Sequence, residues 1–326
     1  MAPLLEIKDL VVEYRTGRGT SHAINGISLT IDNGEALGLV GETGAGKTST
    51  ALSILNLLPK RVGHIENGDI LFKGRSVFSM NKKELMDLRG NKISMIFQNP
   101  LTSLNPVFTI GEQIAMVLRK HRKLDKKQAT LQGENLLQMV GIDKSRFHDY
   151  PNQFSGGMRQ RVGIAAALAC DPELLIADEP TTALDVTIQA QILELIKKLQ
   201  HENSTSLLMI THNLGIISEI CDKVAVMYAG TIVEYGTVQK VFSNPYHWYT
   251  KGLIGALPKL AGPRERLVSI TGNVANSRNL PEGCKFHPRC NFCTEKCQTS
   301  IPSLIQLSED HYAACWNMGG NKDATK

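Results

Sequence analysis

Residues 41–48, Gly-Glu-Thr-Gly-Ala-Gly-Lys-Thr, fit the pattern GxxxxGK(S/T) of a phosphate-binding loop. The apolar run ALGLV (36–40) before the loop predicts a strand buried on both faces, and STALSILNLL (49–58) after it predicts a helix. Glycines let successive backbone N–H groups turn toward a phosphate, and the N-terminus of the helix adds positive potential. The motif in this strand–loop–helix setting predicts a nucleotide site.

Two side chains of the loop have defined chemistry. Lys47 is expected to reach the β- and γ-phosphates, and the Thr48 hydroxyl is expected to ligate Mg²⁺. The expected nucleotide contacts here are Gly41, Thr43, Gly44, Ala45, Gly46, Lys47, Thr48 and Ser49.

A pair of acids follows a second apolar strand, in LLIADE (174–179). Asp178 ends the strand, so we expect its carboxylate at the carboxyl edge of the sheet, holding Mg²⁺ through water. Glu179 is expected to polarise the attacking water as general base. Two acids after a strand are equally typical of a solvated turn or a helix cap, and the phosphate-binding loop favours the catalytic interpretation.

Apolar strands alternate with helices along the chain, which predicts an α/β fold with parallel strands. Further strands are expected at 6–15, 27–31, 92–97, 173–178, 206–212 and 223–230, and helices at 157–170 and 187–200. Segment 64–74 predicts a hairpin with its turn at Asn67-Gly68. Because Pro, Gly, Asn and Cys become frequent after about 240, we divide the chain into a nucleotide-binding domain (1–240) and a C-terminal extension (241–326). Residues from about 100 to 158 form a helical subdomain within the first.

Composition excludes several classes of protein. The 326 residues carry 36 Lys and Arg against 31 Asp and Glu, a net charge of +5, which is too weak to indicate nucleic-acid binding. No run reaches 18 apolar residues, and the charged N-terminus does not resemble a signal peptide. We therefore expect an unexported protein that does not cross a membrane.

Five of the seven cysteines fall within residues 284–315. In an unexported protein such a group of cysteines favours a metal site over disulfide bonds. Four thiolates suit a 4Fe–4S cluster or tetrahedral Zn²⁺, and the two-residue spacing of Cys290 and Cys293 also suits Zn²⁺. His287 and His311 are expected to be solvated loop residues rather than ligands.

The stretch FSGGMRQR (154–161) resembles the signature of ATP-binding-cassette (ABC) ATPases, and its Ser155 precedes Asp178 by 23 residues. The residues themselves predict a helix that Ser155 caps and whose free N–H groups face an anion. The resemblance implies an ABC core of the P-loop class with a mixed β-sheet. It also implies a dimer in which two cassettes, identical or related, sandwich two ATP molecules.

The same resemblance assigns roles to individual residues. These are Mg²⁺ and water contact for Gln98, adenine stacking for Tyr14, γ-phosphate contact for His212, partner contact for Asp185, and contact with the partner's ATP for Ser155, Gly156 and Gly157. A lone strand-end His is otherwise typical of a structural residue, and an aromatic residue on an early strand is typical of the core. Met158 and Asn213 depart from the usual Gln and Asp of the family pattern.

A narrower resemblance is to the importers of dipeptides, oligopeptides and nickel. It rests on QNPLTSLNP (98–106), SGGMRQR (155–161) and Asn244-Pro245-Tyr246, and is strongest to the dipeptide-transport ATPases. It implies an ATP-hydrolysing subunit at the cytoplasmic face of the cell membrane. Its partners would be permease subunits, a second ABC ATPase and, indirectly, an external peptide-binding protein. The alternatives are a nickel importer, or a soluble ABC ATPase that acts on nucleic acid and carries a zinc tail.

Some ATPases of this branch bind a 4Fe–4S cluster in a segment similar to GCKFHPRC (283–290). Carried onto this chain, the ligands are Cys284, Cys290, Cys297 and Cys315, and Cys293 is the spare. The expected cofactors are therefore ATP, Mg²⁺ and a 4Fe–4S cluster, with Zn²⁺ as the alternative to the cluster.

Overall fold

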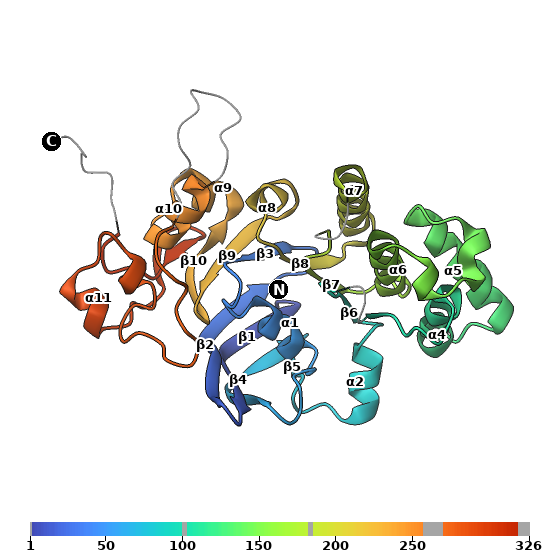
Figure 1. Cartoon of the computed structure of the whole chain (residues 1–326), viewed down its shortest axis with the longest axis horizontal. Coiled ribbons are helices and arrows are strands. Elements are labelled where there is room, and N and C mark those ends of the chain that lie inside the picture. The colour runs from blue at the N-terminus through green and yellow to red at the C-terminus, as the bar shows by residue number, and fades with distance from the viewer. Residues whose placement is uncertain (1, 100–102, 182–184, 257–269, 319–326) are drawn as a thin grey trace. The chain divides into compact units, whose positions relative to one another are not determined.

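The computed structural model describes residues 2–99, 103–181, 185–256 and 270–318. The chain folds into two compact units, each assembled from separate stretches of sequence (Figure 1). Unit 1 comprises Met1–Leu4, Ile31–Ala36 and Ser76–Thr211, and unit 2 comprises Leu5–Thr30, Leu37–Arg75 and His212–Lys326. Pro100, Leu101 and Thr102 of the importer-like stretch, and residues 183 and 184 before Asp185, lie outside the described residues.

Unit 1 is built on three parallel strands, with β7 (Leu174–Asp178) between β6 (Ile93–Ile96) and β8 (Ser206–Ile210). Every residue of these strands is buried, as the continuous apolar runs predict for strands covered on both faces. Because the strands are parallel, their carboxyl ends share one edge. The side chains that follow β6 and β7 are therefore brought together there.

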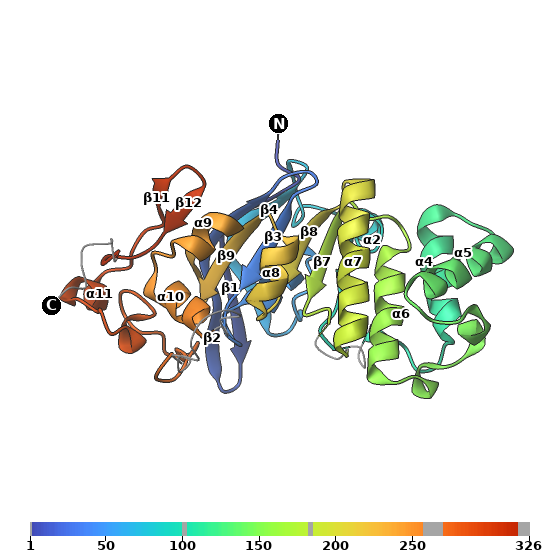
Figure 2. The ribbon, with the colours of Figure 1, turned by 90° about the horizontal axis from the view of Figure 1, so that it is seen from above.

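The other regular elements described in unit 1 are helices. They are α2 (Lys82–Leu88), α4 (Ile110–Arg122), α5 (Lys126–Met139), α6 (Gly156–Leu168) and α7 (Val186–Asn203), with 3₁₀ segments η1 (Lys144–His148) and η2 (Pro151–Gln153). The expected helices at 157–170 and 187–200 are confirmed as α6 and α7. Helix α4 packs against α5 (Figure 2), and Asp125 forms a capping box with Gln128 that starts α5.

Unit 2 contains an antiparallel sheet in the order β2–β1–β4–β5. Its strands are β1 (Leu5–Thr16), β2 (Gly19–Ile31), β4 (Gly63–Phe72) and β5 (Arg75–Ser76). The hairpin expected at 64–74 is wrong, because β4 runs unbroken through Asn67 and Gly68 beside β1. The register shifts near Val11, and a Cβ at Gly68 would lie 2.3 Å from the Lys8 carbonyl oxygen. The Asn-Gly pair therefore serves a bulge rather than a turn.

The remaining strands of unit 2 follow the order β3–β9–β10–β12–β11. They are β3 (Ala36–Val40), β9 (Lys223–Tyr228), β10 (Thr231–Thr237), β11 (Ile305–Ser308) and β12 (His311–Ala313). β3 pairs with β9 in parallel and the later pairs are antiparallel, so the mixed sheet is confirmed.

The helices of unit 2 are α1 (Lys47–Ile54), α8 (Leu214–Ile220), α9 (Val238–Ser243), α10 (Trp248–Gly255), α11 (Glu295–Thr299) and the 3₁₀ segment η3 (His287–Arg289). Helix α1 ends four residues before the predicted end at 58. In the described part of the chain, no helix combines the length and apolar character needed to cross a bilayer.

Candidate functional site

The phosphate-binding loop joins β3 to α1 in a backbone shape that requires glycine. Gly41 has φ +154° and Gly46 has φ +107°, a region that side chains rarely adopt. A Cβ at Gly41 would lie 2.1 Å from the Met227 carbonyl oxygen, and one at Gly46 would lie 2.4 Å from that of Ala23. Backbone surrounds the loop on these sides, so its shape is set before any phosphate arrives.

Lys47 begins α1 and is buried, with 8% of its surface exposed. Its Nζ donates to the carbonyl oxygens of Gly41 at 2.8 Å and Glu42 at 3.0 Å. The ammonium therefore lies over the loop, tied to its first two residues. This is the position from which a lysine reaches the phosphates of a nucleotide in such loops.

Tyr14 on β1 lies against the helix that follows the loop. Its hydroxyl and the Ser49 hydroxyl are 3.1 Å apart, which joins β1 to the first turn of α1. The hydroxyl of Tyr14 is thus tied to the phosphate-loop helix. The role of its ring in adenine stacking stays a prediction.

The acidic edge of unit 1 holds Gln98, Asp178 and Glu179. Gln98 Nε2 donates to Glu179 Oε2 at 2.9 Å, which joins two residues 81 positions apart. Asp178 is 2% exposed at the end of β7, and Glu179 adopts the left-handed conformation, φ +47°. The Glu179 N–H donates to the Ile210 carbonyl oxygen at 2.8 Å, so the turn that carries this carboxylate is fixed to β8.

Gln160 connects the segments that carry Gln98 and Glu179, a role that the sequence pattern does not predict. It lies on α6, is 2% exposed, and its Nε2 donates to the carbonyl oxygens of Phe97 at 3.3 Å and Pro180 at 3.1 Å. Those carbonyls belong to the residues beside Gln98 and Glu179. A glutamine inside the signature stretch is the only signal that pointed to it.

The signature segment presents a helix N-terminus at the surface. Ser155 caps α6 by accepting from the Met158 N–H at 3.3 Å, and both Ser155 and Gly156 are exposed. Gly157 is half-buried. Asp185 likewise caps α7, accepting from the Ile188 N–H at 3.0 Å. The Ser155 cap is as expected and the Asp185 cap was not predicted, while the contacts of these residues with a partner and its ATP stay predictions.

His212 is exposed at the start of the next stretch of unit 2. Its neighbour Asn213 caps α8, with Oδ1 accepting from the N–H groups of Gly215 at 2.9 Å and Ile216 at 3.4 Å. An Asn caps a helix as well as the Asp that the family pattern leads one to expect. The departure at Asn213 therefore leaves the cap intact.

Thiols of the cysteine segment lie near one another, and besides burial both Cys297 and Cys293 contribute to raising the pKa of Cys290. The pKa of Cys315 is raised to about 11, mainly by burial and also by the nearby thiols of Cys284, Cys290 and Cys297. Burial also raises the pKa of Cys284, where Cys297 and Cys290 again contribute. The Cys284 N–H donates to the Cys297 carbonyl oxygen at 2.8 Å. The residues assigned by resemblance are thus neighbours.

The described residues contain no group of three or more His, Cys, Asp or Glu arranged to hold a metal ion. The expected metal centre, whether 4Fe–4S or Zn²⁺, therefore gains no support from the structure. The expectation that His311 is solvated is wrong. It is 2% exposed, and its Nε2 lies 2.8 Å from Glu234 Oε1, because β12 pairs with β10 and carries it into the core.

Comparisons with known proteins agree with these features. Residues 24–182 match the model of a family described as ABC transporter, and residues 233–297 match one described as oligopeptide/dipeptide transporter, C-terminal region. An oligopeptide transport ATP-binding protein from Haemophilus influenzae is 48% identical over 97% of this chain and 98% of its own length. One from Bacillus subtilis is 46% identical over 96% of this chain and 88% of its own.

Solved structures show the same similarity. A dimeric ATP-binding cassette in a post-hydrolysis state, bound to ADP and Pi, has a TM-score of 0.65 at 26% identity. It covers 72% of this chain and 98% of its own. A component of an ABC transporter complex from Clostridium perfringens has a TM-score of 0.61 at 28% identity, covering 74% and 92%.

Proposed function

This chain belongs to the ABC transporter family of ATPases, and we propose that it is the ATP-hydrolysing motor subunit of a membrane importer for peptides. The peptide assignment rests on the relatives, which are oligopeptide transport proteins matched over nearly their whole length, and on the matching C-terminal region. These relatives favour peptides over nickel as cargo, and an importer over an ATPase that acts on nucleic acid. The subunit acts at the cytoplasmic face, where ATP is available.

The proposed chemistry assigns one task to each polar group. Lys47 neutralises the β- and γ-phosphates, and Thr48 and Asp178 hold Mg²⁺, which supplies charge neutralisation when it is bound. Glu179 accepts a proton from the attacking water. Gln98 orients that carboxylate, a role supported by the 2.9 Å hydrogen bond between the two side chains. His212 contacts the γ-phosphate.

The substitution Glu179→Gln tests this assignment. It keeps the size of the side chain and removes the base, so we expect turnover of ATP to fall about 100-fold or more while ATP binding persists. Glu173→Gln is the matched control, because Glu173 lies just before the same strand and pairs with Lys92 at 3.1 Å. Unchanged turnover in Glu179→Gln would remove Glu179 as the base.

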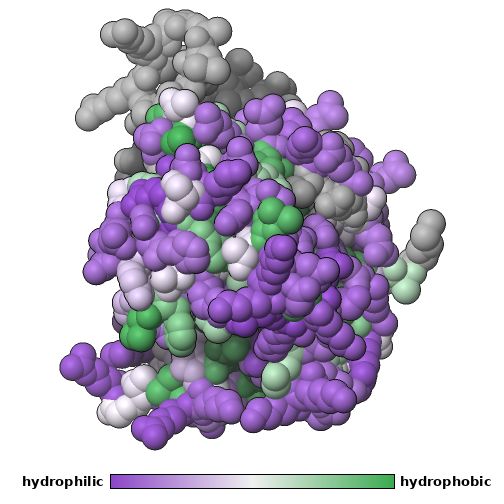
Figure 3. Space-filling model, turned by 90° about the vertical axis from the view of Figure 1, so that its right-hand side faces the viewer, coloured by the Kyte–Doolittle hydropathy of each residue, from purple (hydrophilic) through white to green (hydrophobic). Residues whose placement is uncertain are grey.

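We propose that the helical segment that follows Gln98 contacts the permease. Val107 is 74% exposed and Phe108 is 43% exposed, just before α4. The surface on the side of α4 and α5 is mostly hydrophilic with scattered apolar residues (Figure 3). Val107→Asp is expected to keep soluble ATPase activity and lose co-purification with the permease. Leu131→Asp, at a 61% exposed position on α5, is the control that keeps both.

Two such cassettes are proposed to pair, with the exposed Ser155, Gly156 and Asp185 of one facing the ATP of the other. The similar cassette solved as a dimer with ADP and Pi supports this arrangement. The expected observation is that Glu179→Gln, which binds ATP without hydrolysing it, elutes as a dimer with Mg-ATP and as a monomer without it. If the partner is a related subunit instead of a second copy, the dimer forms only when both subunits are mixed.

We further propose that Cys284, Cys290, Cys297 and Cys315 are the ligands of a 4Fe–4S cluster that orders the C-terminal segment. The choice of ligands rests on the resemblance of residues 283–290, and the hydrogen bond from the Cys284 N–H to the Cys297 carbonyl oxygen at 2.8 Å holds two of the four residues together. A cluster places irons and sulfides between its ligands, so it tolerates wider thiol spacing than one Zn²⁺ ion does. Iron and sulfide analysis of protein purified without oxygen should give about four of each per chain, retained in Cys293→Ser and lost in Cys297→Ser. One zinc without sulfide would contradict the cluster.

A further inference from the structure

We infer that Arg289, in the cysteine-bearing C-terminal segment, is a positioning residue for nucleotide binding because it masks the charge of Glu42 inside the phosphate-binding loop. The inference rests on the proposed nucleotide function of that loop. Glu42 and Arg289 are 247 positions apart in sequence and both belong to unit 2.

The contact is a two-point ion pair. Arg289 Nη1 lies 2.6 Å from Glu42 Oε2, and Nη2 lies 3.1 Å from Oε1. The side chain of Arg289 is 4% exposed and that of Glu42 is 27% exposed. A fork-to-carboxylate pair in such a setting has charge-assisted hydrogen bonds and fixed geometry.

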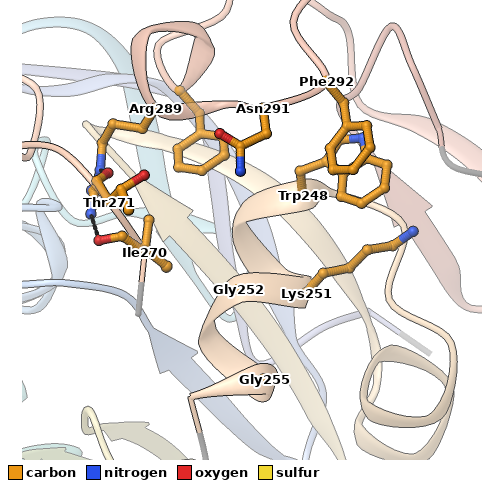
Figure 4. A pocket seen from close by; sticks show the side chains of 10 residues that line it. Trp248, Lys251, Gly252, Gly255, Ile270, Thr271, Arg289, Asn291 and Phe292 are labelled. Carbon is orange, nitrogen blue, oxygen red and sulfur yellow. Dashed lines mark hydrogen bonds between the residues drawn. The ribbon is translucent and has the colours of Figure 1, made fainter. Parts of the chain in front are cut away.

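Arg289 is held in place independently of Glu42. Its Nε donates to the Thr271 carbonyl oxygen at 3.0 Å, and its Nη2 lies 3.4 Å from that of Ile270, beside a pocket of about 390 Å³ (Figure 4). The rings of Tyr228 and Phe286 flank its guanidinium at 5.8 and 5.9 Å. The cation is therefore presented to the loop by a preformed aromatic and carbonyl setting.

Glu42 is in turn connected to the residue that is expected to contact phosphate. Its carbonyl oxygen accepts from Lys47 Nζ at 3.0 Å, and its N–H donates to the Tyr249 hydroxyl at 2.8 Å. An unmasked carboxylate at this point would repel phosphate and compete for the lysine ammonium. Arg289 neutralises the carboxylate, so that its charge does not oppose the phosphates that Lys47 is expected to contact.

The experiment measures binding of the fluorescent nucleotide mant-ADP with Mg²⁺ to the full chain. We expect Arg289→Met to weaken binding about tenfold, the loss that one charge-assisted hydrogen bond represents. Glu42→Gln removes the repelling charge and is expected to tighten binding about twofold, and the double variant to return to within about threefold of the parent protein. The control is Lys251→Met. Lys251 lines the same pocket (Figure 4), and its ammonium lies over the Trp248 ring at 4.2 Å, so this variant removes a different cation from the same place.

The double variant separates charge masking from a purely structural role. If Arg289 only anchored the C-terminal segment, adding Glu42→Gln would not restore binding, and that result overturns the inference. So does a Lys251→Met variant that loses as much affinity as Arg289→Met. If Arg289→Met does not fold, Arg289→Lys replaces it, because lysine keeps the charge but lacks the two-point contact of the guanidinium. Its nucleotide binding is expected to be weaker than that of the parent protein and to be restored by adding Glu42→Gln. A parent protein that does not bind mant-ADP would instead refute the proposed function.

Discussion

Substitution by alanine is expected to lower the free energy of unfolding at Gly111 and to raise it at Gly163. A Cβ at Gly111, in the first turn of α4, would lie 2.2 to 2.4 Å from three ring atoms of Phe147. Phe147 is 3% exposed in η1, and its ring also lies close to Gly133, where an added Cβ would come within 2.9 Å of it. Overpacking of this kind costs about 1–3 kcal/mol, whereas Gly to Ala in a helix gains at most about 1 kcal/mol. We expect Gly111→Ala to lower the free energy of unfolding by about 1–2 kcal/mol.

Gly163→Ala is the matched control, because the nearest atom to its added Cβ is Ser103 Oγ at 3.8 Å. It lies in the middle of α6, so we expect it to raise the free energy of unfolding by about 0.5–1 kcal/mol. Urea unfolding followed by circular dichroism measures both changes. Hydrogen exchange of the α4 and α5 peptides shows whether the loss is local.

A second substitution locates the cause. Phe147→Leu removes the ring, so Gly111→Ala should cost less in that background than in the parent protein. A Gly111→Ala protein as stable as the parent, or equal costs in the two backgrounds, would refute the reasoning from the steric contact.

Two further predictions concern the loop and the C-terminal extension. Gly41→Ala should weaken mant-ADP binding more than tenfold, because its Cβ would lie 2.1 Å from the Met227 carbonyl oxygen. The control Gly17→Ala adds a Cβ in open space and should bind like the parent protein. Equal affinities of the two variants would contradict this prediction. Burial lowers the pKa of His247 from 6.5 to about 3, and its Nδ1 accepts from the Tyr249 N–H. Between about pH 6.5 and pH 3, His247 is protonated in the unfolded chain but not in the folded chain. The free energy of unfolding should therefore fall by about 1.4 kcal/mol per pH unit as the pH drops through this range. His247→Asn, which keeps an acceptor at the helix start, should flatten that slope in urea unfolding between pH 7.5 and 5.5, and identical slopes would contradict the assignment.

Much of the core was predictable because it depends on local patterns. The runs at 36–40, 173–178 and 206–212 became β3, β7 and β8, since strands buried on both faces leave continuous apolar segments. The hairpin at 64–74 failed for a physical reason. An Asn-Gly pair is typical of a tight turn, but here β4 continues through Asn67 and Gly68 and pairs with β1. The left-handed backbone of Gly68 therefore forms a bulge in the strand instead of a turn.

The amino-acid sequence by itself determined the chemistry that is local. The glycines and lysine of 41–48 specify a loop for phosphate, and Ser155 caps the helix that follows it. These features depend on residues within a few positions, so they can be recognised before the chain is folded.

Only the tertiary structure decided which distant groups meet. Gln98 bonds Glu179 across 81 positions, Arg289 pairs with Glu42 across 247, and His311 reaches Glu234 inside the core across 77. Such pairs follow from strand order and from the return of the C-terminal segment, neither of which leaves a periodic trace in the sequence. Their geometry is set by packing, because a buried charge is stable only where the fold supplies its partner.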